Sequence, residues 1–347
     1  MSTLSCEAYV CDPRPNYPLF ITAKRYWIPD DTSEDPEALT LVFAHGTGFH
    51  KEQWEPTIEE LYDSVRREGK PRMIREAWSI DAPNGGDAAV LNEETLLQDY
   101  SVFDWQEYAR AVHIFLTGLG TGVDVDFSDR KLVGIGHSMG AIAMILAGTY
   151  VPKLKFTSVI LVDPVLYPHP PLRGVRDISG PLLAATNARR DIWPSRAEAL
   201  AACQARSSFK AWDARVLQIF IEHGLRDLPT TYYPDKSGVT LKYSKAQEVA
   251  SYKDEQGKRR AYNYLPTLCA KIPVHFIYGA VDDFLPRIVQ DYTLNIGTKG
   301  RYASARRVEG SGHMVPQMQP KGLADAIREV LTEEPAPHAA TRASSRL

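Results

Sequence analysis

The sequence predicts an α/β protein with a mostly parallel central sheet, flanking helices and an inserted helical cap. Strand-like apolar segments alternate with amphipathic helical segments along most of its 347 residues, a pattern typical of a parallel sheet. The alternation stops in the middle of the chain, where helical segments follow one another. Hydrophobic residues make up 44% of the chain, enough to bury a core. We therefore expect a core from residues 1–163 and 271–333, a cap from residues 164–270, and a flexible tail over residues 334–347.

The first part of the predicted core consists of three strands and one helix. Leu19 to Ile28 and Thr40 to Ala44 have the apolar and β-branched composition of strands. Apolar residues recur every three or four positions from Glu52 to Glu68, which predicts an amphipathic helix. A further strand is predicted over Met73 to Ile80, and it ends at a turn over Asp81 to Asp87.

The next part continues the alternation through an uncharged stretch. A helix is predicted over Trp105 to Leu119, and strands over Lys131 to Ile135 and Thr157 to Val162. The run from Leu132 to Pro152 has no charged residue and is about long enough to cross a bilayer. Glycines, a histidine and a serine interrupt its beginning, however. We interpret it as a buried strand that turns into a buried helix over Met139 to Tyr150, and not as a membrane span.

The cap and the end of the core complete the expected fold. From Pro164 to about Leu268, prolines cluster and helical segments follow without a convincing strand between them, which predicts the inserted cap. Strands are expected again over Pro273 to Tyr278 and Ala305 to Val308, before a closing helix over Lys321 to Leu331.

The motif Gly136-His137-Ser138-Met139-Gly140 lies directly after a predicted strand and directly before a predicted helix. A serine at such a turn is held in a strained conformation that presents its hydroxyl as a nucleophile. The amide of Met139 would then point toward an oxyanion. Gly134 and the later Asp163 give the segment a loose likeness to a dinucleotide-binding turn. The glycine spacing differs from that fingerprint, so we favour a nucleophilic Ser138.

A nucleophilic serine requires a base and an acid, and both occur later in the chain. His313 follows a glycine-rich loop between the last predicted strand and the last helix, where the base belongs if the chain order is Ser, Asp, His. Asp282 is the preferred acid, and it follows the predicted strand that ends at Tyr278. Asp163 and Asp283 remain alternatives, since each also follows a predicted strand.

Four motifs together resemble the α/β-hydrolase superfamily: Gly136-His137-Ser138-Met139-Gly140, His45-Gly46-Thr47-Gly48, Gly279-x-x-Asp282-x-x-x-Pro286 and Gly312-His313-Met314. The resemblance implies a serine hydrolase without a cofactor, in which the amides of Thr47 and Met139 form the oxyanion hole. The Asp81 to Asp87 turn departs from the usual family pattern. Together with the His-Gly-Thr-Gly-Phe segment and the Ser-Arg-Leu end, it is similar to a fungal group. That group includes peroxisomal lipase-like enzymes and hydrolases assigned to toxin biosynthesis.

Charge narrows the range of partners. The net charge of −3 gives no support for nucleic-acid binding, and the remaining histidines lack metal-ligand spacing, so we expect neither a nucleic acid nor a metal. The segment from Val165 to Ala270 carries sixteen Lys and Arg against ten Asp and Glu. This surplus is typical of solvated helix faces, and it would also favour an anionic substrate such as a coenzyme A thioester or a free carboxylate.

The sequence ends in Ser345-Arg346-Leu347. This end resembles a peroxisomal address. It predicts that the protein binds an import receptor and is located in the peroxisome; the cytoplasm is the alternative location. The expected substrate is a small acyl ester or thioester. Acyl transfer, C–C cleavage and isomerisation remain open, because one triad geometry serves all of these chemistries. A catalytically silent binding role is a further alternative, and the presence of a nucleophile, a base and an acid argues against it.

Overall fold

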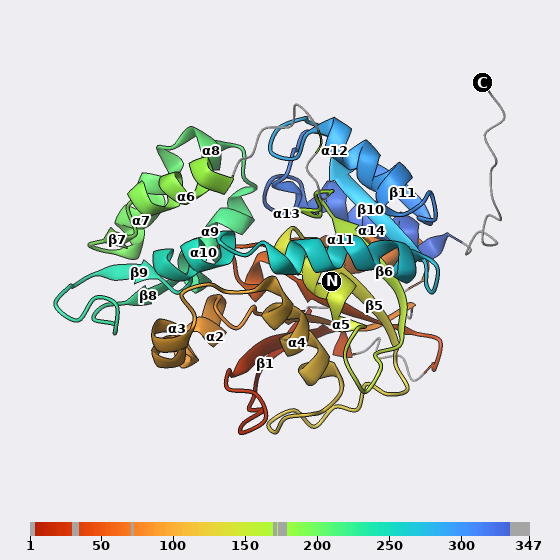
Figure 1. The fold of residues 1–347 in the computed structure, drawn as a ribbon, viewed down its shortest axis with the longest axis horizontal. Helices are drawn as coiled ribbons and strands as arrows, with labels where there is room; N and C mark the ends of the chain where they lie inside the picture. Colours follow the sequence, from red (N-terminus) through yellow and green to blue (C-terminus); the bar gives the residue numbers. More distant parts are fainter. Residues whose placement is uncertain (1–3, 30–34, 71–72, 169–171, 173–178, 334–347) are drawn as a thin grey trace.

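The computed structural model describes residues 4–29, 35–70, 73–168, 172 and 179–333, and its centre is an eight-stranded sheet (Figure 1). The strands follow the order β1-β2-β4-β3-β5-β6-β10-β11. β2 pairs antiparallel with β1 and β4, and the pairs from β4 to β11 are parallel. The α/β class with a mostly parallel sheet is therefore confirmed. The strand bounds are β1 (Ser5–Cys11), β2 (Ile21–Trp27), β3 (Leu39–Ala44), β4 (Ile74–Ile80), β5 (Lys131–His137), β6 (Phe156–Val162), β10 (Val274–Gly279) and β11 (Ser304–Val308).

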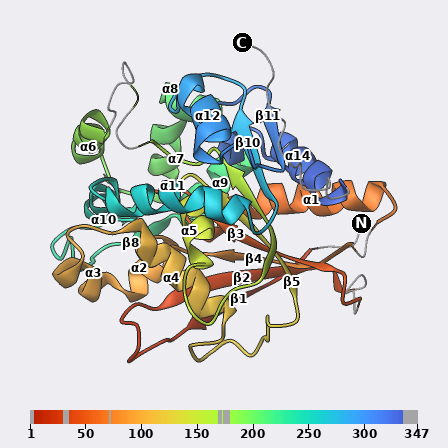
Figure 2. The same ribbon diagram turned by 45° about the vertical axis from the view of Figure 1, so that its right-hand side comes forward.

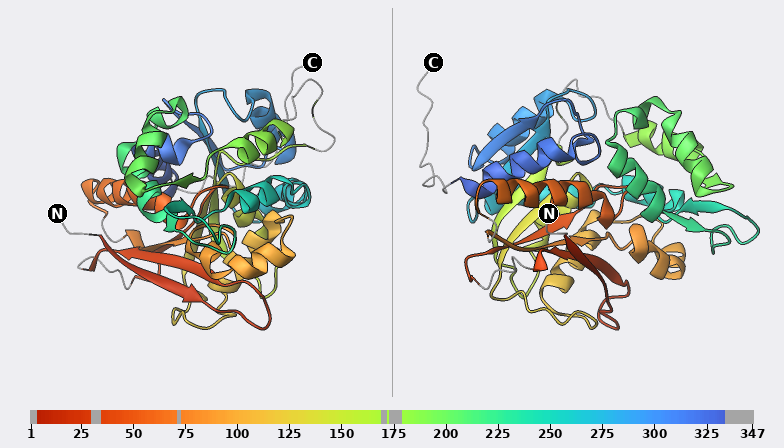
Figure 3. Two further views of the ribbon diagram at one scale, coloured as in Figure 1. Left: turned by 90° about the vertical axis from the view of Figure 1, so that its left-hand side faces the viewer. Right: turned by 180° about the vertical axis from the view of Figure 1, so that it is seen from behind.

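Helices cover both faces of the sheet. The face seen in Figure 1 carries α4 (Trp105–Leu116), α5 (Met139–Ala147), α11 (Gln256–Cys269) and α12 (Arg287–Tyr292). The opposite face carries α1 (Glu55–Arg67) and α14 (Pro320–Thr332), which lie side by side in Figure 2 and in the right-hand view of Figure 3. The shorter helical segments are the 3-10 helix η2 (Lys51–Trp54), α2 (Gly86–Leu91), α3 (Glu93–Asp99), the π-helix η4 (Thr293–Gly297) and α13 (Val315–Met318).

The uncharged stretch predicted as a buried strand and helix forms β5 and α5. All nine residues of α5 are buried, because the helix lies between the sheet and the helices α4 and α11. An all-apolar helix is expected in such a place, since no side of it faces water. Within the described ranges, no helix has the length and apolarity needed to cross a membrane.

The segment predicted as a cap contains helices and a small sheet, and this sheet was not expected. Strands of two or three residues are too short to give a periodic signal in the sequence. The strands β7 (Ile192–Trp193), β9 (Val239–Leu241) and β8 (Leu225–Asp227) pair antiparallel in that order. The helices are α6 (Ser179–Ala188), α7 (Arg196–Gln204), α8 (Ser207–Lys210), α9 (Ala214–His223) and α10 (Lys245–Tyr252).

The cap has its own small apolar core, which includes Trp193, Leu217 and Phe220. In contrast, α11 belongs to the same stretch of sequence but packs on α5, and its residues Leu265 and Leu268 join the main core. The cap therefore meets the core along α10 and α11. The tail with Ser345-Arg346-Leu347 and the prolines at 170 and 171 lie outside the described residues.

Strand register places the ends of the central strands at one edge of the sheet. Ala44 of β3 pairs with Gly136 of β5, and His137 of β5 pairs with Val162 of β6. Val162 in turn pairs with Ile277 of β10. The residues that follow these strands therefore meet at a common edge, which is where parallel sheets of this kind bind their ligands.

Candidate active site

Ser138 occupies the sharp turn between β5 and α5. Its backbone φ of 54° is rare for a residue other than glycine and costs about 1–3 kcal/mol, so the surroundings must enforce it. Its N–H donates a hydrogen bond to the Val162 carbonyl at 3.0 Å. A Cβ on Gly136 would lie 2.3 Å from the Gly140 carbonyl oxygen, and one on Gly140 would lie 2.2 Å from that of Ala44. Glycine is therefore required on both sides of the serine.

His313 lies between Ser138 and a carboxylate. Its Nε2 atom is 3.2 Å from Ser138 Oγ, and its Nδ1 atom is 2.9 Å from Asp163 Oδ1. Because an ionised carboxylate can only accept, Nδ1 carries the proton and Nε2 is left to accept from the hydroxyl. The three side chains form one continuous hydrogen-bonded chain, and all three residues are buried.

Asp163 is held as an ionised acid. Burial raises the pKa of its carboxyl, but the hydrogen bond and charge of His313 outweigh burial, helped by the Gly279 N–H that donates to Asp163 Oδ2 at 3.0 Å. The net result is a pKa below the usual range. The N–H of Asp163 also donates to the Ile277 carbonyl at 2.8 Å, which fixes the backbone at the end of β6.

The structure corrects the order of preference between the two acids. Asp282 is exposed, and its carboxylate accepts a hydrogen bond from the Arg287 N–H at 3.0 Å, at the beginning of α12. It therefore bonds to the backbone at the beginning of α12, and none of the described hydrogen bonds joins it to His313. Instead, the alternative acid Asp163, at the end of β6, is the carboxylate that hydrogen-bonds to the His313 imidazole.

The backbone of His313 is held from both sides by residues whose roles the sequence did not reveal. Its N–H donates to Asp283 Oδ1 at 2.9 Å, and its carbonyl accepts from His137 Nε2 at 2.8 Å. The pKa of His137 is lowered to about 3, mainly by burial and to a smaller extent by the charge of the nearby His313. The His137 ring therefore stays neutral, and its Nε2–H donates to the His313 carbonyl. The Phe284 ring stacks on the His313 imidazole with centroids 4.4 Å apart.

The residues expected to form an oxyanion hole lie beside Ser138. Met139 is the first residue of α5, so its N–H has no partner within the helix. The Thr47 hydroxyl lies 3.5 Å from the Met139 sulfur, and a Cβ on Gly46 would lie 3.3 Å from Ser138 Cβ. The loop after β3 therefore passes directly over Ser138. His45 stabilises this loop, because its Nδ1–H donates to the Gly46 carbonyl at 2.8 Å.

A pocket of about 1000 Å³ lies over Ser138 between the core and the cap. Its volume is at the upper end of the range for small-molecule sites, so it has room for a long or bulky substrate. Arg189 and Glu248 form a bidentate ion pair on the cap side of the pocket, with Nη1 and Oε1 2.9 Å apart. The aromatic side chains that line the pocket include Phe49, Trp193, Phe209, Trp212 and Phe220. Among the described residues, no group of three or more His, Cys, Asp and Glu is arranged to hold a metal ion.

The fold and the geometry of the site together define the class of protein to which the chain belongs. The chain belongs to the alpha/beta hydrolase family, whose sequence model matches residues 41–326. The peroxisomal alpha-beta-hydrolase Lpx1 from Saccharomyces cerevisiae has a similar fold, with a TM-score of 0.72 and 22% identity over 99% of this chain and 94% of that one. The family and fold expected from the sequence are thus confirmed.

Sequence relatives support the resemblance to fungal members of the family. The Type I acyl-CoA thioesterase mpaH of Penicillium brevicompactum is 32% identical over 216 residues, which are 62% of this chain and 45% of that protein. The abhydrolase domain-containing protein AKT2 of Alternaria alternata is 26% identical over 230 residues, which are 59% of this chain and 84% of that protein. The chain spans about half the length of the thioesterases that it matches.

Proposed function

We propose that the protein is a serine hydrolase that cleaves an acyl ester or thioester, with Ser138 as nucleophile, His313 as base and Asp163 as acid. The observation that carries this proposal is the continuous chain of contacts from Ser138 Oγ through the imidazole to the Asp163 carboxylate. Hydrogen-bonded serine, histidine and acid in this order are the arrangement that activates a hydroxyl for acyl transfer.

The geometry supports a two-step reaction. Ser138 Oγ attacks the substrate carbonyl carbon while its proton passes to His313 Nε2. The developing oxyanion accepts hydrogen bonds from the amides of Thr47 and Met139. When the bond to the leaving group breaks, His313 returns the proton to the leaving oxygen or sulfur. A water molecule, activated by the same histidine, then releases the acid and restores the serine.

The relatives and the pocket favour a thioester with a large acyl group. Among the sequence relatives, the Penicillium proteins are named acyl-CoA thioesterases. A pocket of about 1000 Å³ with several aromatic side chains offers apolar area for such a group. We include an acyl thioester in the proposed substrate class on this basis.

Labelling with a fluorophosphonate probe tests the proposed function. The wild type is expected to take the label and to hydrolyse p-nitrophenyl esters and acyl thioesters. Ser138→Ala should take no label and lose about 10³-fold or more in kcat, because the nucleophile is gone. Ser208→Ala is a matched control, since Ser208 is an exposed serine that lines the same pocket. Equal labelling of wild type and Ser138→Ala would overturn the assignment.

We also propose a peroxisomal location. Lpx1 from Saccharomyces cerevisiae, named as a peroxisomal protein, is similar in fold over most of the chain and 33% identical over 151 residues. The role of Ser345-Arg346-Leu347 as a peroxisomal address remains a prediction. A fluorescent protein fused ahead of residue 1 should show a punctate pattern that overlaps a peroxisomal marker. A diffuse pattern would contradict the proposal.

A further inference from the structure

The arginines of the cap region fall into two groups according to their partners. The structure describes eight arginines between residues 165 and 270, and five of these form ion pairs with carboxylates within 4 Å. The paired ones are Arg189, Arg196, Arg215, Arg226 and Arg260. Three further described arginines have no carboxylate of the described residues within that distance: Arg190, Arg206 and Arg259. All three line the pocket above Ser138.

These three arginines come from three separate segments. Arg190 follows α6, Arg206 lies between α7 and α8, and Arg259 lies in the first turn of α11. All three are exposed, whereas aromatic residues of the same pocket, such as Trp193 and Phe220, are buried. The pocket therefore has an apolar interior and a basic outer rim. We refer to Arg190, Arg206 and Arg259 as the arginine rim.

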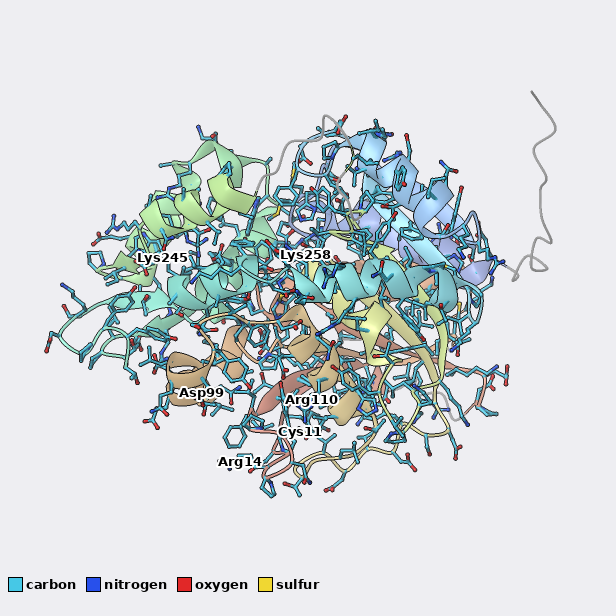
Figure 4. All side chains as sticks on the ribbon, in the orientation of Figure 1. Cys11, Arg14, Asp99, Arg110, Lys245 and Lys258 are labelled. Atoms are coloured by element: carbon cyan, nitrogen blue, oxygen red, sulfur yellow. The ribbon has the colours of Figure 1, made fainter. Side chains whose placement is uncertain are left out.

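Other charged residues of the pocket do not neutralise the rim. Glu248 is occupied by its bidentate pair with Arg189, and the Asp283 carboxylate accepts from the His313 N–H. Glu255 is exposed and lines the pocket, but it forms no ion pair with an arginine of the rim. Lys258, at the beginning of α11, also lines the pocket (Figure 4), and its Nζ atom lies 5.2 Å from the centroid of the Trp105 ring. Among the described residues that line the pocket, arginine and lysine therefore outnumber aspartate and glutamate.

We infer that the arginine rim binds the phosphate groups of a coenzyme A leaving group while the acyl chain occupies the aromatic interior. This inference rests on the proposed function. Guanidinium groups pair well with phosphate oxygens, and three of them on separate segments match a ligand with several phosphates better than one with a single carboxylate. The thiol of such a ligand is joined to its phosphates by a long arm, so the thioester reaches Ser138 while the phosphates stay at the mouth.

The test compares two thioesters that share an acyl group. Octanoyl-coenzyme A carries the phosphates, whereas the octanoyl thioester of N-acetylcysteamine has the same reacting bond without them. The test variant is Arg206→Gln/Arg259→Gln. Arg190 stays intact because its Nε–H donates to the Ile192 carbonyl at 2.7 Å and its guanidinium covers the Trp193 ring. The matched control is Arg196→Gln/Arg260→Gln. It removes the same charge from paired arginines on α7 and α11 that lie outside the pocket lining.

The rim should matter for only one of the two substrates. We expect the test variant to lose about tenfold in kcat/KM for octanoyl-coenzyme A, mainly through KM, because charge-assisted contacts to phosphate are removed. Its kcat/KM for the N-acetylcysteamine thioester should stay within about twofold of wild type. Added salt should weaken the preference of the wild type for the coenzyme A substrate. The control variant should match wild type with both substrates.

Several outcomes would overturn the inference while leaving the hydrolase proposal intact. One is an unchanged kcat/KM of the test variant for octanoyl-coenzyme A, and another is an equal loss with both substrates. A third is a loss of kcat/KM that occurs only with an N-acetylcysteamine thioester whose acyl chain ends in a carboxylate. This result would show that the arginine rim binds the carboxylate of the acyl group and not the phosphates. Calorimetry with free coenzyme A and the Ser138→Ala protein tests the rim without turnover. Removal of both arginines should weaken this binding about tenfold, and equal binding would refute the inference even if no substrate is hydrolysed.

Discussion

Every polar group of His313 has a partner in the structure. The side chain contacts Ser138 and Asp163, and the backbone contacts Asp283 and His137. These four partners come from three separate segments of the chain, because His137 and Ser138 are adjacent in the sequence. The position of the imidazole is therefore determined before a substrate arrives, which is the condition for a base to act without reorganising its surroundings.

Replacement of the two candidate acids separates their roles. Asp163→Asn should lower kcat about 10³- to 10⁴-fold, because an amide favours the wrong tautomer of His313 and does not stabilise its cation. Asp282→Asn is the matched control and should stay within about twofold of wild type, since its carboxylate accepts a hydrogen bond from the N–H of Arg287 and, among the described residues, none from His313. Steady-state hydrolysis of a p-nitrophenyl ester measures both. A larger loss in Asp282→Asn than in Asp163→Asn would contradict the geometry.

The site residues differ in how far the sequence could predict them. Ser138 and His313 have local signals, because glycine-flanked turns are readable as motifs. The acid has no such signal: Asp163 and Asp282 both follow strands, and β6 and β10 are neighbours whose ends share one edge. The choice between them depends on the direction that each loop takes after its strand. Asp163 has a φ of 40° set by contacts between strands, and a sequence pattern does not report such contacts.

At the scale of elements, the turn after β4 is built around a buried lysine. Lys51 of η2 is 1% exposed, and its Nζ atom lies 2.9 Å from Glu52 Oε1, 3.0 Å from Asp81 Oδ2 and 2.5 Å from Asp87 Oδ2. Burial raises the pKa of Asp81, but the charge of Lys51 outweighs it and holds that pKa at about 2. A Cβ on Gly86 would overlap the Asp81 carboxylate, which explains the glycine at this point of the unusual turn.

Removal of this lysine should destabilise the fold. Lys51→Met leaves buried carboxylates without their cation, and we expect a loss of about 3–5 kcal/mol in the free energy of unfolding. Lys242→Met is the control, because Lys242 contacts the same Asp87 at 2.6 Å from a more exposed position and should cost at most about 1 kcal/mol. Urea denaturation followed by circular dichroism measures both. Equal losses would show that burial of the lysine does not matter.

Elements of the core could be predicted more fully than those at its margins. The predicted strand over Lys131 to Ile135 and the closing helix over Lys321 to Leu331 correspond to β5 and α14, because their apolar patterns are dictated by burial. The edge strand β1 gave no such pattern, since most of its residues are not buried. The two- and three-residue strands of the cap exist only through their pairing with one another, so no local pattern marks them.

At the scale of the whole molecule, buried and half-buried histidines link stability to pH. The pKa values of His50, His113, His137 and His275 are lowered, and burial is the largest cause for each of them. Those of His137 and His275 fall to about 3 and about 4. In the unfolded chain a histidine binds a proton below about pH 6.5. Between about pH 6.5 and pH 4, the unfolded state therefore binds more protons than the folded state.

The sign of this effect follows from linkage: stability is fully present above about pH 6.5 and is lost as the pH falls toward the lowered values. The free energy of unfolding should thus decrease from pH 7 to pH 5, by up to about 1.4 kcal/mol per pH unit for each histidine that is charged only when unfolded. His275→Gln removes one such group while keeping a polar side chain beside Ser304, so urea denaturation at several pH values should give it a shallower slope than wild type. Parallel slopes for the two proteins would show that His275 takes up its proton equally in both states.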